Sequence, residues 1–285
     1  MRAPWWLAAA LVAWFTPGSA WAAEPESDLA RHLQAERRQR AELTIARSSE
    51  QIESSAVDNR ELAAAFRARG VARSNLLQHA EALEDISRAV ELDPFNARYY
   101  EDRARAYLKL REFKSASADL DMALGLDSRR WSAQRDKGRL AAYQGQFFEA
   151  SGEFRRAWRL SDDETSVYTA IWVDIVERRA GGPGTGAVDD LLAQLDPARW
   201  PAPVLGMLRG KLSPDETVAA VRMSDPRAAL PFRCEAHFYA GQFYLMQGET
   251  ARARAAFEAA VATGVVEYLE YDWALRELEM MGVSR

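Results

Sequence analysis

A 34-residue repeat constrains the fold of this chain more than any other feature of its sequence. Four series of residues recur at that offset, or within one residue of a multiple of it: Gly70, Ala104, Gly138, Trp172, Gly206 and Gly241; Ala82, Ala116, Ala150 and Ala253; Ile86, Leu120, Phe154 and Phe257; Ala89, Ala123, Ala157 and Ala260. Ala150, Phe154 and Ala157 lie at i, i+4 and i+7, which is one face of a helix. Because a single helix pair cannot bury such a face alone, the pattern predicts an all-α stack of helix pairs.

The residue types in the repeat resemble those of the tetratricopeptide repeat (TPR). Its signature places a small residue in the first helix, then A-x₃-F and a further small residue in the second helix, then Pro. Pro94 fills that last place in the first repeat. The resemblance implies an all-α, TPR-type α-solenoid of stacked antiparallel helix pairs. Full repeats are expected at 63–96, 97–130, 131–164 and 234–267, so three regular repeats cover 63–164.

The segments between and around these repeats fit the pattern less well. Residues 165–233 are expected to form degenerate helix pairs, because Trp172 replaces the small residue and "GGPGTG" at Gly181–Gly186 breaks the helix. That run lacks the Gly-Lys-Ser/Thr ending of a phosphate-binding loop. Ser213 and Glu216 form a predicted capping box with Pro at the first helical position. An N-terminal helical cap is expected at 23–62, and 234–285 should hold the last repeat and a capping helix.

The N-terminus reads as a secretory signal peptide at 1–22. Arg2 supplies the positive charge, Trp5–Phe15 is an apolar run, and "AWA" at Ala20–Ala22 is an A-x-A cleavage site. The sequence therefore predicts cleavage after Ala22 and a periplasmic protein with no stable membrane insertion afterwards. A retained membrane anchor is the alternative.

Charge and cysteine usage narrow the class further. The net charge is −5, from 37 basic and 42 acidic residues, which argues against non-specific binding to nucleic acid. Cys234 is the only cysteine, so an intrachain disulfide is impossible and packing must stabilise the fold.

The second half of the chain is similar to exported bacterial TPR proteins of the NlpI type. The resemblance rests on "YTAIWVDIVERRAG" (168–181), "RWPAPVLGMLRGKLSPDE" (199–216) and the stretch from Cys234 to Gly282, in that order. It implies a non-enzymatic adaptor of the cell envelope that docks peptidoglycan hydrolases and a processing protease. Proteins of that type carry an acylated Cys after the signal, and this chain has none there.

No catalytic or metal-binding motif stands out. HExxH, GxSxG and Cys/His/Asp arrangements are absent, and His32, His79 and His237 are scattered over separate repeats. Cys234 and His237 lie at i, i+3 on an expected helix, but a metal site would need further ligands. The sequence therefore predicts no enzyme activity, no cofactor and no metal.

The concave face, lined by the first helix of each repeat, is the predicted binding surface. The groove-facing places of the TPR family correspond here to Arg67, Ser74 and Asn75; Arg98, Glu101, Arg105 and Lys109; and Arg135, Arg139 and Tyr143. An Arg-lined groove would suit acidic peptides or C-terminal carboxylates through forked hydrogen bonds. It differs from the carboxylate clamp of chaperone-binding TPRs, because Arg67 and Val71 occupy the places where that clamp needs Lys and Asn. Solvated arginines without a ligand are the alternative.

These observations favour a protein-binding scaffold or adaptor, with other proteins or acidic or C-terminal peptides as partners. The rival interpretation is an assembly or structural subunit of a larger envelope or secretion complex. Both need only a groove, so sequence alone does not separate them.

Overall fold

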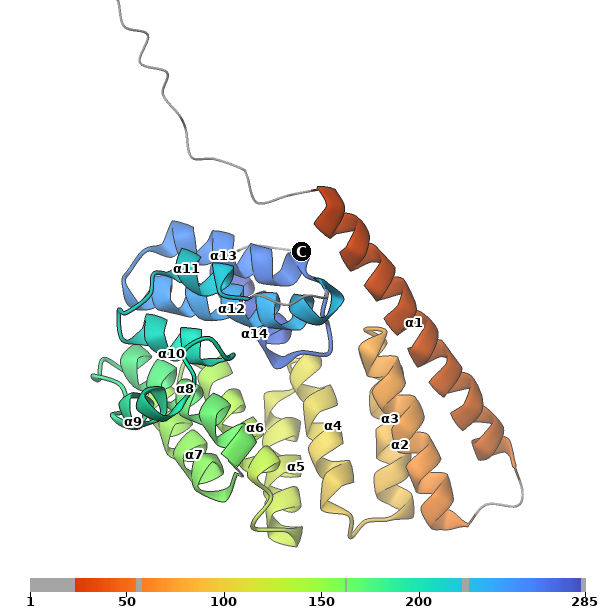
Figure 1. Ribbon diagram of the computed structural model, residues 1–285. Coiled ribbons are helices and arrows are strands. Elements are labelled where there is room, and N and C mark those ends of the chain that lie inside the picture. The colour runs from red at the N-terminus through yellow and green to blue at the C-terminus, as the bar shows by residue number, and fades with distance from the viewer. Residues whose placement is uncertain (1–23, 55–57, 162, 222–225, 283–285) are drawn as a thin grey trace, which may run out of the picture.

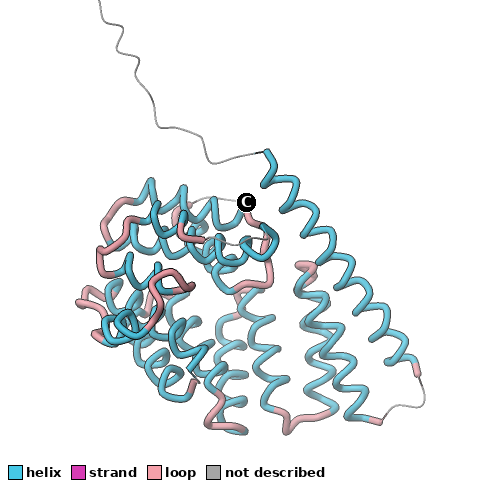
Figure 2. The backbone as a smooth tube through the Cα atoms, viewed as in Figure 1, coloured by secondary structure: helices cyan, strands magenta, loops and turns pink. Residues whose placement is uncertain are grey.

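The computed structural model describes residues 24–54, 58–161, 163–221 and 226–282, and the predicted signal peptide with its cleavage site lies outside them. Within these ranges all regular structure is helical, and no strand occurs (Figure 2). The helices are α1 (Glu24–Glu53), α2 (Asn59–Asn75), α3 (His79–Leu92), α4 (Ala97–Lys109), α5 (Phe113–Leu126), α6 (Trp131–Tyr143), α7 (Phe147–Leu160), α8 (Asp163–Arg179), α9 (Ala187–Gln194), α10 (Ala202–Leu208), α11 (Pro214–Ala219), α12 (Pro226–Met246), α13 (Thr250–Ala262) and α14 (Leu269–Met280). None of the described helices is long and apolar enough to cross a membrane.

Successive helices pack as antiparallel pairs, α2 with α3, α4 with α5, α6 with α7 and α12 with α13 (Figure 1). This arrangement confirms the predicted all-α solenoid. The small residues of the second helices are fully buried, including Ala123 and Ala157 at 0 % exposure, as the register predicts.

Close approach within a pair explains the small residue of each first helix. A Cβ atom added to Gly138 would lie 2.9 Å from the ring of Phe154, which is itself fully buried. A Cβ atom at Gly70 would lie 2.7 Å from Ile86 in the same way. The ring or branched side chain of the second helix therefore occupies the space that a larger residue would need.

The turns inside the pairs repeat the same backbone conformation. Leu77, Arg111 and Gly145 are 34 residues apart and have φ of 62°, 65° and 75°. Only Gly adopts this left-handed region without steric cost. The fold imposes the conformation on Leu77 and Arg111 because the turn geometry is common to every pair.

Paired charges join the two helices of the first two pairs. Arg69 binds Asp85 and Arg103 binds Asp119 with two hydrogen bonds each, at 2.7–2.9 Å. Each residue lies 34 positions from its equivalent. Because each carboxylate is at least 95 % buried, the guanidinium of the facing helix supplies its counter-charge.

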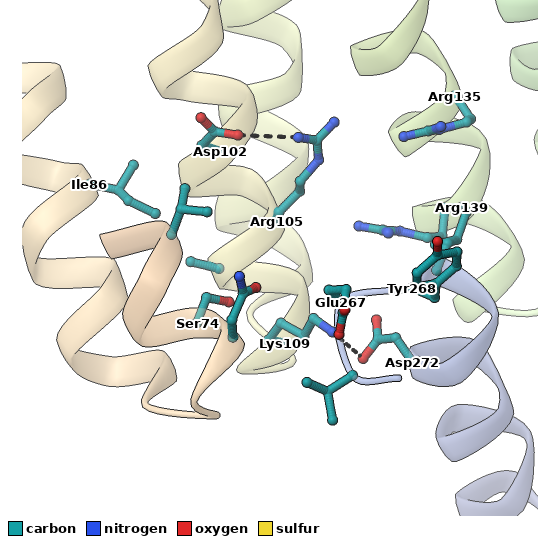
Figure 3. Close-up of a pocket in the computed structure, with 15 residues that line it drawn as sticks. Ser74, Ile86, Asp102, Arg105, Lys109, Arg135, Arg139, Glu267, Tyr268 and Asp272 are labelled. Atoms are coloured by element: carbon teal, nitrogen blue, oxygen red, sulfur yellow. Dashed lines mark hydrogen bonds and ion pairs between the residues drawn. The ribbon is translucent and has the colours of Figure 1, made fainter. Parts of the chain in front are cut away.

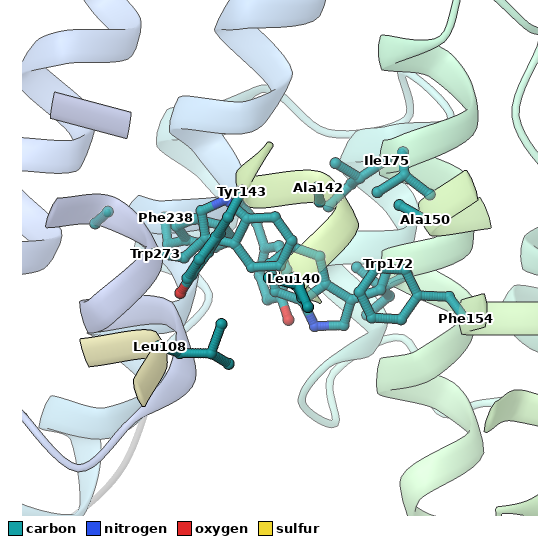
Figure 4. Close-up of a cluster of buried hydrophobic side chains, with 14 of the residues drawn as sticks. Leu108, Leu140, Ala142, Tyr143, Ala150, Phe154, Trp172, Ile175, Phe238 and Trp273 are labelled. Carbon is teal, nitrogen blue, oxygen red and sulfur yellow. The ribbon is translucent and has the colours of Figure 1, made fainter. Parts of the chain in front are cut away.

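The region from α8 to α11 departs from this pattern. The Gly181–Gly186 run forms a loop, and Ser213 and Glu216 form the predicted capping box at the start of α11. Trp172 on α8 is buried and stacks on Trp273 of α14, with ring centroids 4.1 Å apart and planes 8° apart (Figure 4). Trp172 therefore joins the N-terminal stack to the C-terminal helices.

Candidate functional site

The concave side of the stack contains a cavity of about 310 Å³, which we call the arginine cavity. It is lined by Val71, Ser74, Asn75, Ile86, Asp102, Arg105, Ala106, Lys109, Arg135, Arg139, Val266, Glu267, Tyr268, Leu269 and Asp272. Its walls thus come from α2, α3, α4 and α6, and from the C-terminal segment that leads into α14 (Figure 3).

Ion pairs hold this C-terminal segment inside the groove. Glu267 binds Arg37 of α1 at 2.9 Å, and Asp272 binds Lys109 of α4 at 2.8 Å. The hydroxyl of Tyr143 on α6 donates to Asp272 at 3.0 Å. The segment therefore contacts three helices that lie far from it in sequence, and it closes one side of the cavity.

Carboxylates of the protein itself hold Arg105. Its Nε donates to Asp136 at 2.7 Å, and its two terminal nitrogens donate to Asp102, at 3.2 Å, and to Glu101. Asp136 is completely buried, which raises its pKa, but the charges of Arg105, Arg139 and Arg135 more than offset this and lower the pKa to about 2. Asp136 is therefore ionised at neutral pH, and Arg105 binds α4 to α6.

The guanidinium groups of Arg135 and Arg139, by contrast, form no hydrogen bond within the part of the chain that the structure describes. Their nearest carboxylate oxygen is Oδ1 of Asp136, at 3.7 and 3.8 Å, which is beyond hydrogen-bonding distance. The Nε atoms of both residues are buried without an acceptor. Arg139 is only 6 % exposed, and both side chains extend from α6 toward α4 (Figure 3). These two groups can receive an anion without breaking a hydrogen bond.

Burial and like charge both act on this pair. Burial lowers the pKa of Arg135, and the charges of Arg105 and Arg139 lower it further, against the attraction of Asp136. Arg135 packs over the ring of Trp131, with its Cζ atom 5.1 Å from the centroid, and Arg139 packs over Tyr143. The stacking orients both guanidinium groups and supplies no hydrogen-bond acceptor.

Two further cavities adjoin the arginine cavity. The aromatic cavity, of about 470 Å³, is lined by Trp131, Arg135, Tyr168, Thr169, Trp172, Phe232, Glu235, Glu267, Tyr268, Leu269 and Glu270. The N-terminal cavity, of about 410 Å³, is lined by Arg37, Arg40, Ala41, Thr44, Arg67, Ala68, Val71, Ala72, Asn75, Val266 and Glu267. Glu267 lines all three, so the cavities follow one another along the concave face.

The other residues predicted for the groove lie in different environments. Asn75 lines both the arginine and N-terminal cavities, and Arg67 lines the N-terminal cavity while bound to Asp102. Tyr143 is 1 % exposed beneath α14. Arg98 is exposed at the start of α4, outside these three cavities. The structure thus places Arg105, Arg135 and Arg139 together and separates Arg98 from them.

Several acidic residues of the site were not expected from the sequence. Asp102 and Asp136 precede Arg105 and Arg139 by three residues and lie 34 positions apart, so the repeat itself carried a signal for these ion pairs. Glu235, Glu267, Glu270 and Asp272 gave no such signal, because they reach the groove through contacts between distant segments.

No group of three or more His, Cys, Asp or Glu in the described ranges could hold a metal ion. Cys234 is fully buried in α12, and burial raises the pKa of its thiol. This environment disfavours the thiolate that metal binding or nucleophilic chemistry needs.

No family model matches the chain. Among solved structures, a tetratricopeptide repeat protein from Parabacteroides merdae is similar, with a TM-score of 0.51 and 18% identity over 90% of this chain and 99% of that chain. PilW, described as a type IV pilus biogenesis factor, has a TM-score of 0.46 and 16% identity over 75% of this chain and 98% of that chain. YrrB, described as a TPR protein with an unusual peptide-binding site, has a TM-score of 0.40 and 18% identity over 81% of this chain and 97% of that chain. The first comparison supports a TPR-type α-solenoid.

Proposed function

We propose that this protein is a non-enzymatic protein-binding scaffold of the cell envelope, and that its concave groove holds a carboxylate of a partner protein. The observation that carries the proposal is the pair of guanidinium groups of Arg135 and Arg139, which line the arginine cavity without a hydrogen-bond acceptor. A protein–protein scaffold is also the use to which the TPR architecture is suited, because its stacked helices create an extended concave surface.

A carboxylate fits these two side chains for electrostatic and geometric reasons. Buried donors without acceptors cost free energy, and a planar carboxylate accepts two parallel hydrogen bonds from one guanidinium. Arg105 is paired with Glu101, Asp102 and Asp136, whereas Asp136 is the one carboxylate of the described residues within 4 Å of Arg135 or Arg139. An arriving anion would therefore gain hydrogen bonds and reduce the repulsion between the arginines.

The cellular setting of the proposal rests on the sequence. The signal peptide at 1–22 supports export to the periplasm, and the NlpI-type resemblance supports envelope proteases or peptidoglycan hydrolases as partners. In-cell crosslinking followed by purification from the periplasm should recover such proteins. Recovery of a secretion or polymer-export complex instead would favour the assembly subunit.

The groove is tested most sharply by Arg139→Lys, which keeps the positive charge beside Asp136 and removes the forked donor. The probe is the fluorescein-labelled peptide Ala-Glu-Ala-Ala-Leu with a free carboxyl terminus. We expect about tenfold weaker binding, which corresponds to the loss of one charged hydrogen bond. Arg105 is left unchanged, because its loss would strip the buried Asp136 of its hydrogen-bond partner.

The matched control is Arg129→Lys, at an exposed position in the turn before α6, which should bind like wild type. Equal binding by Arg139→Lys and wild type, or equal binding of the peptide acid and its carboxamide, would exclude the arginine cavity as the carboxylate site.

A further inference from the structure

The aromatic cavity lies directly beside the arginine cavity and has the opposite character. The two share Arg135, Tyr268 and the adjoining loop residues. Beyond Arg135, the aromatic cavity is walled by rings, including Trp131 and Tyr168, and by carboxylates, of which Glu235 and Glu270 are 5 % and 6 % exposed.

Neutral side chains donate hydrogen bonds to both of these buried carboxyl groups. Glu235 accepts a hydrogen bond from the indole of Trp200 at 2.6 Å, and Glu270 accepts one from the hydroxyl of Tyr239 at 3.0 Å, and both donors are neutral. Arg135, the arginine that lines the aromatic cavity, has its ion pair with Asp136 and not with either of these carboxylates. Burial raises the pKa of both groups, and the charge of Glu270 raises that of Glu235 further, while the hydrogen bond from Tyr239 and the charges of Arg135 and Arg139 lower the pKa of Glu270 by less than burial raises it.

The aromatic walls suit a cation as well. Arg135 already packs over Trp131, which shows that this part of the wall accepts a positive group on a ring face. The two sides of the site therefore differ in what they offer a ligand. On one side Arg139 is nine-tenths buried and its Nε has no acceptor; on the other side Glu235 and Glu270 accept hydrogen bonds from neutral donors, and the charges of Arg135 and Arg139 act on Glu270 from beyond ion-pair distance.

We infer that the groove binds the carboxyl-terminal residue of its partner and that this residue is Lys or Arg. Its terminal carboxylate would bind Arg135 and Arg139, and its basic side chain would enter the aromatic cavity between Glu235 and Glu270. The preceding residues would leave along the N-terminal cavity, which shares Asn75 and Glu267 with the arginine cavity. The inference rests on the proposed function, since the carboxylate of the partner is the same group.

A C-terminal Lys or Arg suits both the arginine cavity and the aromatic cavity, because its terminal carboxylate and its basic side chain carry opposite charges a few bonds apart. An acidic terminus would place a negative charge beside Glu235 and Glu270 and so raise the cost of ionising either group. An apolar terminus would fill the aromatic cavity but supply no cation to stabilise their ionised form.

Four fluorescein-labelled peptides test the inference on the wild-type protein: Ala-Glu-Ala-Ala followed by Lys or norleucine, each as the free acid and as the carboxamide. Norleucine keeps the aliphatic chain and removes the ammonium group. We expect the lysine acid to bind about tenfold more tightly than the norleucine acid, the effect of one charged contact on an aromatic face. Both acids should bind more tightly than their carboxamides.

The variant Glu235→Gln keeps the size and the acceptor for Trp200 and removes the carboxyl group whose ionised form the ammonium group would stabilise. It should bring the ratio of lysine-acid to norleucine-acid affinity close to one. Glu258→Gln, on an exposed surface of α13, is the matched control and should keep the wild-type ratio.

The outcomes separate the two proposals. Equal affinities of the lysine and norleucine acids for wild type would overturn this inference and leave the carboxylate site standing. Acids that bind no better than carboxamides would overturn both. If free lysine displaced the lysine peptide at equal concentration, the ligand would be a free amino acid and not the terminus of a protein. That result would overturn the inference.

Discussion

The pair α6/α7 and the helix α8 solve the same packing problem in opposite ways. Gly138 leaves space that the ring of Phe154 fills from the partner helix. Thirty-four residues later Trp172 fills the equivalent space itself and stacks on Trp273 of the distant α14. The pattern returns in α12 and α13, where the ring of Phe257 packs on Gly241. A small residue is therefore needed in the first helix of a pair only where the second helix supplies a large side chain to fill the space. The helix that follows α8 is α9, which has eight residues and does not supply such a side chain.

The largest expected effect on stability comes from removing the ring of Trp172, which stands where the regular repeats have a small residue. Trp172→Ala should lower the free energy of unfolding by ~3–5 kcal/mol, the range for removal of a buried aromatic ring. Urea denaturation followed by circular dichroism measures the change. Additive losses in Trp172→Ala, Trp273→Ala and the double variant would show that the two rings do not stabilise each other.

Buried carboxylates give a second contrast between the regions. Asp85 and Asp119 in the regular pairs bind arginines, whereas Glu235 has a pKa raised to about 8 by burial and by Glu270. Since the folded state holds this proton more tightly than the unfolded chain, the contribution to stability is full below pH 4.5 and is lost as pH rises to about 8.

Glu235→Gln removes this titration. Its free energy of unfolding relative to wild type should therefore rise between pH 4.5 and pH 8, by ~1.4 kcal/mol for each pH unit over which the folded wild type keeps this proton and the unfolded chain does not. Thermal melts at several pH values measure the difference, with Glu258→Gln as the exposed control. A difference that stays constant over this range would mean that Glu235 titrates normally.

A smaller effect is expected at Gly138, where the regular packing is tested directly. Gly138→Ala gains helix propensity but pushes a Cβ atom against the buried ring of Phe154, for a net loss of ~1–2 kcal/mol. Gly152→Ala in α7, where the added Cβ meets no atom within 4 Å, should instead gain up to ~1 kcal/mol. Similar changes in melting temperature for the two variants would contradict the close approach.

The smallest effect concerns the turns inside the regular pairs. Leu77→Gly relieves a left-handed conformation and should stabilise the protein by about 0.5 kcal/mol, because the entropy cost of Gly offsets part of the gain. Gly145→Ala, at the equivalent place, should destabilise it by about 1 kcal/mol. Chemical denaturation of both variants measures these changes, and effects of the same sign would refute the shared turn geometry.

The repeat predicts which arginines of the site lie near one another, but it does not predict which carboxylates pair with them. Arg105 and Arg139 lie 34 residues apart and so occupy equivalent helix positions, and Arg135 lies one helical turn before Arg139 on the same face. Which of the three guanidinium groups hydrogen-bonds Asp136 depends on differences of about one ångström, 2.7 Å for Arg105 against 3.7 and 3.8 Å for Arg135 and Arg139. No periodic pattern encodes such differences.

The sequence by itself determined the helix pairs, the burial of Ala123 and Ala157, the loop at Gly181–Gly186 and the capping box at Ser213. These features depend on side chains close together in the chain or related by the repeat period. Only the tertiary structure brought the segment before α14 into the groove and set Glu235 beside Glu270. Those contacts join residues far apart in sequence and unrelated by the repeat period, so no local pattern of the chain predicts them.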